Sequence, residues 1–187
     1  PPRRKKLCIH NLKELKDQSS TNTEDLREAF IKCASKETFF AWKKYKEDKQ
    51  KNKNDEAPTT EPDDELMKGT IPEEFKRIMY YTFGDYRDIY LDKDISSDGY
   101  IKNISKKIKA LIKENDSKTT DDKEENLNSK LESSWEEHKR TIWKGMLCGL
   151  TYDIQNGENN IIEKLHKKHN YPCDLEVFAS KPQFLRW

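Results

Sequence analysis

Apolar residues recur every three or four positions along most of the chain, which is the spacing of amphipathic helices. The clearest run contains Phe75, Met79, Phe83 and Tyr86, and its apolar face continues to Tyr90. Strand-like alternation is scarce. The pattern therefore predicts an all-α fold, a helical bundle whose apolar faces meet in one core.

The same pattern gives approximate bounds for each element. The expected helices cover 7–15, 23–45, 73–90, 101–112, 127–150, 161–165 and 175–179. Polar segments at about 47–68, 92–100 and 113–125 are expected to be long loops. The side chains expected to form the core scaffold are Trp42, Phe75, Met79, Phe83, Tyr86, Trp135, Trp143 and Met146.

Local signals in the region 70–87 predict three finer details. Thr70 stands three residues before Glu73, as in a capping box, and Pro72 is tolerated in the first turn of a helix. A glycine in mid-helix, Gly84, indicates close approach of a neighbouring helix. Asp85 and Arg87 lie inside the aromatic stretch, which favours a partly buried ion pair or hydrogen-bond network there.

Composition limits the classes of protein to consider. Of the 187 residues, 38% are charged and 33% hydrophobic, with a mean hydropathy of −1.14. These values lean toward disorder, but 10% aromatic residues with four tryptophans favour a folded core. A net charge of +1 argues against binding nucleic acid through bulk charge. No run approaches the ~20 apolar residues of a membrane span, and the basic start 1–6 is no signal peptide. The chain reads as an internal fragment.

Four cysteines offer disulfide bonds. Cys8 and Cys33 are 25 positions apart, as are Cys148 and Cys173, so two local pairs are expected. Closing a loop of that size adds about 3 kcal/mol of stability. The alternative is four reduced core thiols in a cytosolic protein.

Catalytic, cofactor-binding and metal-binding patterns are missing from the sequence. There is no phosphate-binding glycine loop, nucleophile elbow or zinc-binding histidine motif. His166 and His169 are three apart, but they lack a third ligand and stand among lysines, so solvated histidines are the simpler interpretation. We therefore expect no enzyme, cofactor or metal. Basic runs, such as 43–53 and 102–113, are solvated faces or, if they converge, an anion-binding surface.

Six segments, in this order, resemble the Duffy-binding-like domains of the Plasmodium falciparum erythrocyte membrane protein 1 family. They are PPRRKKLC (1–8), ETFFAWKKYK (37–46), GTIPEEFKR (69–77), YTFGDYRD (81–88), IWKGMLC (142–148) and PQFLRW (182–187). The likeness spans nearly the whole chain. It implies a disulfide-stabilised helical adhesion module without catalysis. The chain looks like the second subdomain, with flanking subdomains before Pro1 and after Trp187.

The resemblance also implies a setting and partners. Such domains belong to membrane-anchored variant surface antigens, lie on the outer face of infected erythrocytes and adjoin further Duffy-binding-like or CIDR domains. A host protein is the expected ligand, with immunoglobulin M or intercellular adhesion molecule leading. The alternative is a sulfated glycosaminoglycan, chondroitin sulfate or heparan sulfate, bound by lysine-rich helix faces. The near-zero net charge favours a protein.

Ligand choice is expected to lie in the loops 49–64, 92–100 and 113–125 and on exposed helix faces. The candidate contact residues are Lys49, Lys51, Lys53, Lys93, Asp98, Tyr100, Lys106, Lys109, Lys113 and Lys118. The chain departs from the family pattern at three places. Tyr90 replaces a cysteine that many relatives have, Ser134 precedes Trp135 where two tryptophans are common, and Cys173 is absent from some subclasses.

Overall fold

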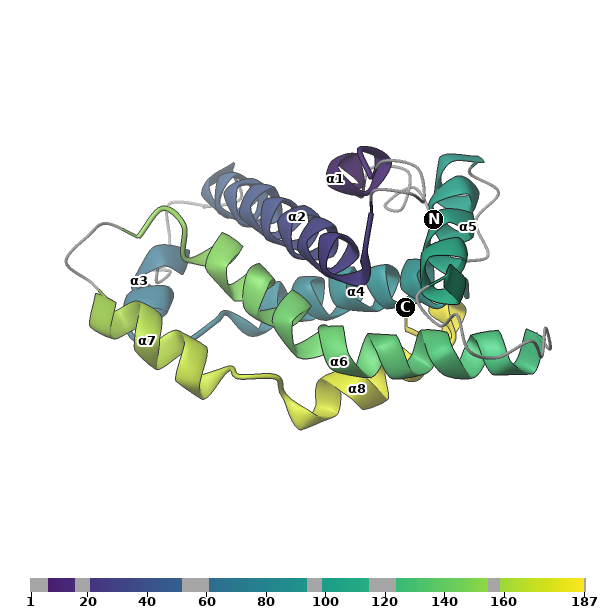
Figure 1. The fold of residues 1–187 in the computed structure, drawn as a ribbon. Helices are drawn as coiled ribbons and strands as arrows, with labels where there is room; N and C mark the ends of the chain where they lie inside the picture. The colour runs from purple at the N-terminus through teal and green to yellow at the C-terminus, as the bar shows by residue number, and fades with distance from the viewer. Residues whose placement is uncertain are drawn as a thin grey trace.

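The computed structural model describes residues 7–15, 21–51, 61–93, 99–114, 124–154 and 159–186. Within these ranges all regular elements are helical and no strand occurs, which confirms the predicted all-α class. The elements, shown in Figure 1, are α1 (His10–Lys13), α2 (Thr23–Lys51), α3 (Pro62–Met67), α4 (Glu73–Tyr90), α5 (Gly99–Glu114), α6 (Glu124–Leu150), α7 (Asn159–Lys168), α8 (Cys173–Ser180) and the 3-10 helix η3 (Gln183–Leu185).

Three long helices, α2, α4 and α6, form the centre of the bundle. Among the described elements, α2 and α6 share the most extensive interface, and α4 packs against both. Figure 1 shows α5 standing at one end of the bundle and α3 and α7 at the other. The short helix α8 packs along α4. This contact between α4 and α8 positions the candidate site described below.

The core lies where the aromatic face of α4 meets α2 and α6. Phe83 of α4 packs against Trp135 and Trp143 of α6, with ring centroids 5.3 and 6.0 Å apart. On the α2 side, Phe75 contacts Trp42 at 4.7 Å. All the side chains expected to form the core are buried: Trp42, Phe75, Met79, Phe83, Tyr86, Trp135, Trp143 and Met146.

The structure differs from the prediction of a loop over 47–68. Helix α2 continues to Lys51, and residues 62–67 form α3. Ion pairs extend the helix beyond its apolar face: Lys44 pairs with Asp48 at 2.8 Å and Lys49 with Glu74 of α4 at 2.7 Å. Helix α3 begins at a proline, a residue favoured at this position, and has acidic residues in its first turn. The other two expected loops, 92–100 and 113–125, were predicted too long. Helix α5 begins at Gly99 and ends at 114, and α6 begins at 124.

The predicted capping box at Thr70 is wrong. Helix α4 begins at Glu73 with Pro72 as its N-cap, and no side chain caps it. The Thr70 hydroxyl instead accepts a hydrogen bond from Lys168 of α7 at 3.0 Å. Thr70 therefore joins the segment before α4 to α7 and does not cap the helix.

The prediction that a neighbouring helix approaches Gly84 is wrong. The group closest to Gly84 is a side chain of the C-terminal segment. A guanidinium nitrogen of Arg186 lies 2.7 Å from where a Cβ would stand at Gly84. Arg186 is 3% exposed, donates to the Asp88 carboxylate and lies 3.7 Å from a carboxylate oxygen of Asp85. The expected buried network therefore exists, but its cation is Arg186. Arg87 points elsewhere, toward a carboxylate of α8.

The described part of the chain contains no disulfide bond, yet two cysteines are in contact. The Cys8 and Cys33 thiols share a hydrogen bond, which lowers the pKa of Cys8 to about 6 and raises that of the more buried Cys33. The Tyr86 hydroxyl holds this pair in place by donating to the Cys8 carbonyl at 2.8 Å. Cys148 and Cys173 are exposed on α6 and α8.

Candidate functional site

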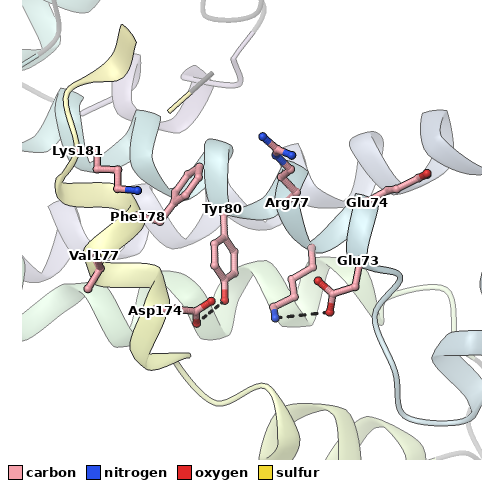
Figure 2. Close-up of a pocket in the computed structure, with 9 residues that line it drawn as sticks. Glu73, Glu74, Arg77, Tyr80, Asp174, Val177, Phe178 and Lys181 are labelled. Carbon is pink, nitrogen blue, oxygen red and sulfur yellow. Dashed lines mark hydrogen bonds and ion pairs between the residues drawn. The ribbon is translucent and has the colours of Figure 1, made fainter. Parts of the chain in front are cut away.

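A surface groove of about 680 Å³ runs between the first half of α4 and α8. Figure 2 shows side chains from both helices facing it. Its lining residues are Glu73, Glu74, Lys76, Arg77, Tyr80, Asp174, Val177, Phe178 and Lys181. We call this feature the α4–α8 groove. It combines an apolar floor with charged side chains of both signs around the rim.

The floor is a pair of rings fixed by packing and a hydrogen bond. Tyr80 and Phe178 meet edge to face, with centroids 5.6 Å apart. The Tyr80 hydroxyl donates to the Asp174 carboxylate at 2.9 Å. Val177, one residue before Phe178, also lines the groove and is 63% exposed. An incoming apolar side chain therefore finds a preformed surface.

The rim carries charges because two helices begin beside it. Helix α4 has Glu73 and Glu74 in its first turn, and α8 has Asp174 in its first turn, where carboxylates offset the positive end of the helix dipole. Lys76 follows one turn later and lies 3.7 Å from Glu73. The rim is consequently mixed in sign.

Arg77 is held in place on the rim by its neighbour Tyr81. Its guanidinium lies 5.8 Å from the centre of the Tyr81 ring and donates to the Tyr81 hydroxyl at 3.3 Å. The outermost acid, Glu74, is paired with Lys49 of α2, and this contact lowers the pKa of Glu74. Both side chains are thus ordered before any ligand arrives, which reduces the entropy lost on binding.

Burial, with the hydrogen bond to Asp174, raises the pKa of Tyr80, so its phenol keeps its proton at neutral pH and is no general base. Within the described ranges no three His, Cys, Asp or Glu side chains are placed to hold a metal ion. His166 and His169 are half-buried, and burial together with nearby lysines lowers the pKa of each imidazole.

The comparison with protein families gives a match to the Duffy binding domain over residues 1–186. The chain belongs to the Duffy-binding family. No curated protein and no solved structure shows a significant match to it. Duffy-binding domains are adhesion modules that bind host receptors and are typically extracellular. In the part of this Duffy-binding chain that the structure describes, we find no helix with the length and apolarity of a membrane span.

The contact residues expected in this Duffy-binding domain do not gather on one surface. Lys49 and Lys51 lie at the end of α2, whereas Tyr100 and Lys106 belong to α5, and Figure 1 shows these two places at opposite ends of the bundle. The Lys93, Lys109 and Lys113 positions lie with the α5 group. The expected contact residues Lys53, Asp98 and Lys118 lie outside the described residues.

Several of these lysines already have partners within the chain. Lys93 pairs with Glu132 at 3.0 Å, and Lys109 pairs with Asp92. Lys49 reaches the rim of the α4–α8 groove through its ion pair with Glu74. Lys49 is thus an expected contact residue that touches the groove, because its ion-pair partner Glu74 is one of the lining residues.

The side chains of Tyr90 and Ser134, two residues singled out in the sequence, meet in the structure. The Tyr90 hydroxyl lies 2.6 Å from the Ser134 hydroxyl and 2.8 Å from Nδ1 of His138. Burial raises the pKa of Tyr90 to about 12 and lowers that of His138, so both are neutral at physiological pH. A satisfied buried hydrogen-bond network therefore links α4 to α6.

Sequence reasoning missed the central groove residues, Tyr80, Val177 and Phe178. Tyr80 and Tyr81 lie beside the row of buried residues on α4. Two adjacent aromatic residues at this place indicate a helix that other elements cover on two sides. Helix α8 supplies the second cover through Phe178, which packs on both tyrosines at 5.6 and 5.2 Å. The eight-residue helix was too short for its periodicity to reveal which side it buries.

Proposed function

We propose that this Duffy-binding domain is a cytoadhesion module of a variant surface antigen on infected erythrocytes. It binds a host protein without catalysis, and the α4–α8 groove is its principal contact surface. The family match over residues 1–186 is the observation that carries the adhesive role. The groove is the second support, because it exposes Val177 between charged groups of both signs.

Immunoglobulin M and intercellular adhesion molecule are the leading ligands in this proposal. Protein interfaces commonly place apolar and aromatic anchors at the centre of a polar rim. The groove has that composition, with Val177 and Phe178 inside and Lys76, Arg77 and Glu73 around them. The alternative ligand, chondroitin or heparan sulfate, needs converging lysines, and the expected lysines lie at two ends of the bundle.

The direct test measures binding of the purified chain to immobilised human immunoglobulin M, intercellular adhesion molecule and chondroitin sulfate. We expect binding to one of the two proteins, with Val177→Asp reducing affinity at least about tenfold, because it places a charge on the apolar part of the interface. Lys106→Glu changes the charge of an exposed residue of α5 that the sequence suggested as a ligand contact, and because it lies outside the groove, the groove proposal expects it to leave protein binding unchanged.

The glycan alternative predicts the reverse pattern. Lys106→Glu then weakens binding to chondroitin sulfate, Val177→Asp has no effect, and affinity falls steeply as salt rises. Absence of binding to both proteins, or equal binding by wild type and Val177→Asp, would contradict the proposal.

We also propose that Cys8 and Cys33 form a disulfide in the oxidising extracellular setting. The contact between their thiols supports this pairing. The two thiols give up two protons and two electrons to oxidised glutathione, whose own S–S bond breaks to give two glutathione thiols as the Cys8–Cys33 bond forms. Non-reducing peptide mapping of secreted protein is expected to recover Cys8 joined to Cys33. The second predicted pair, Cys148 with Cys173, is tested by the same map, and recovery of Cys8 joined to Cys148 would show both pairings to be wrong.

A further inference from the structure

Three aromatic rings stand together at the surface where α2 passes the end of α6. Phe39 lies 5.2 Å from Phe40 and 5.4 Å from Tyr152, measured between ring centroids, and both contacts are edge to face. Phe40 is 63% exposed and Tyr152 is 76% exposed. We call these three residues the α2–α6 aromatic patch. Clustered exposed aromatic rings of this kind mark interaction surfaces more often than isolated ones do.

The backbone beneath the patch is tightly fixed. Gly149 of α6 approaches the Ser35 carbonyl of α2 so closely that a Cβ there would stand 2.1 Å from the oxygen. Thr151, immediately before Tyr152, is buried, and its hydroxyl donates to the Leu147 carbonyl at 2.9 Å. The rings are therefore presented from a rigid crossing of two helices, which lowers the entropy cost of docking a partner.

Phe40 does not contribute to the core of its own helix. The inward side of α2 in this region is formed by Thr38 and Trp42, both buried, and Trp42 packs on Phe75 of α4. Phe40 lies on the opposite side of α2. The fold does not require a large apolar side chain at this exposed position.

Positive charge surrounds the patch one helical turn from Phe40 in both directions. Lys36 precedes Phe40 by four residues, and Lys43 and Lys44 follow it by three and four. The Lys43 ammonium lies 4.4 Å from the centre of the Phe39 ring. Lys44 is paired with Asp48, but neither Lys36 nor Lys43 forms an ion pair with any described residue.

Two exposed acids, Glu47 and Asp153, lie farther along the two helices. Glu47 acts on Lys44, whose pKa it helps to raise, but in the described part of the chain neither acid forms an ion pair with Lys36 or Lys43. The immediate surroundings of the exposed ring thus favour carboxylates on whatever covers it.

We propose that the α2–α6 aromatic patch is a docking surface for a protein segment in which apolar side chains are flanked by aspartate or glutamate. The partner's apolar residue covers Phe40 and Tyr152, and its carboxylates reach Lys36 and Lys43. This contact is separate from the α4–α8 groove, because Figure 1 shows α2 and α8 on opposite sides of α6. It does not rest on the identity of the host ligand.

The test uses fluorescence anisotropy with a labelled amphipathic helical peptide that carries leucine and phenylalanine on one face and glutamate on the other. One twin peptide has lysine in place of every glutamate, and a second has serine in place of every apolar residue. The wild-type chain is expected to bind the acidic peptide and neither twin. Phe40→Ala should weaken this binding about tenfold, and Tyr152→Ala should act in the same direction.

Charge reversal supplies the sharpest readout. Lys43→Glu is expected to weaken binding of the acidic peptide and to allow the lysine twin to bind. Phe184→Ala removes an equally exposed phenylalanine elsewhere, at 70% exposure, and should change nothing. Thermal unfolding by circular dichroism is expected to be the same for all variants, because each replaced side chain is exposed.

Other occupants give different results, and each overturns the proposal. Concentration-dependent dimers that Phe40→Ala dissolves identify a second copy of this chain as the occupant. Competition by chondroitin sulfate that is lost in Lys43→Glu identifies a glycan. Equal binding of the acidic peptide by wild type and Phe40→Ala removes the patch from consideration. Host-protein binding that Val177→Asp abolishes and Phe40→Ala spares leaves the groove proposal standing even if this one fails.

Discussion

Replacing Arg186 with methionine is expected to lower the free energy of unfolding by about 3–5 kcal/mol. The substitution keeps much of the side-chain volume but leaves the buried carboxylates of Asp85 and Asp88 without their cation. Removing one partner of a buried ion pair costs more than the pair contributes, because the remaining charge stays desolvated. Urea unfolding followed by far-UV circular dichroism at neutral pH measures the change.

Two companion variants show whether the loss comes from the buried pair. Arg77→Met changes an exposed arginine on the same helix as the two aspartates and should cost less than about 1 kcal/mol. Arg186→Lys keeps the charge but loses the guanidinium fork, so an intermediate loss is expected. A loss below about 1 kcal/mol for Arg186→Met would mean that solvent reaches both aspartates after the change.

This ion pair also bears on the α4–α8 groove. Arg186 donates to the Ala179 carbonyl at 3.0 Å as well as to Asp88, so it joins the end of α8 to α4. Arg87 contributes a second link through Glu176, whose carboxylate also pairs with Lys139 of α6 at 3.1 Å. The groove therefore depends on contacts made by residues outside its own lining.

The sequence allowed the long helices and their buried faces to be predicted, because each repeats its apolar residues over several turns. Phe75, Met79, Phe83 and Tyr86 of α4 follow that spacing, and all four are buried. Periodicity identifies the buried side of a helix without specifying which partner covers it. Periodicity is therefore enough to predict the fold class and the core residues. It is not enough to predict the α4–α8 groove.

The remaining features depend on pairs that are distant in sequence. Arg186 is charged and near the end of the chain, so no local pattern places it in the core, yet it donates to Asp88, 98 positions earlier. Tyr80 and Asp174 are 94 positions apart and define the groove floor only after α8 has packed on α4. Residues 47–51 were assigned to a loop because their helix is supported by ion pairs, which hydrophobic spacing does not register.

The α2–α6 crossing leads to the second prediction with a large expected effect. Gly149→Ala places a Cβ 2.1 Å from the Ser35 carbonyl oxygen and 2.8 Å from its carbon, both backbone atoms of α2. A flexible side chain could move aside, but a helix backbone moves only with its packing. Since α2 and α6 share the most extensive interface among the described helices, we expect a net loss of about 2–3 kcal/mol in unfolding free energy.

Three glycines of the chain make a graded series that isolates this cause. Alanine is a better helix former than glycine by up to about 1 kcal/mol, so the same exchange is stabilising or neutral where space is open. Gly99, with nothing within 4 Å of its Cβ position, is the open case. At Gly145 the nearest atom is the Ile31 Cγ2 methyl at 2.8 Å, which can rotate away, and the loss should be smaller than at Gly149. Urea unfolding is expected to rank the alanine variants as Gly149 least stable, then Gly145, then Gly99.

If Gly149→Ala also weakens peptide binding at the α2–α6 aromatic patch while Gly145→Ala does not, the close approach at Ser35 both stabilises the bundle and positions Tyr152 beside Phe39.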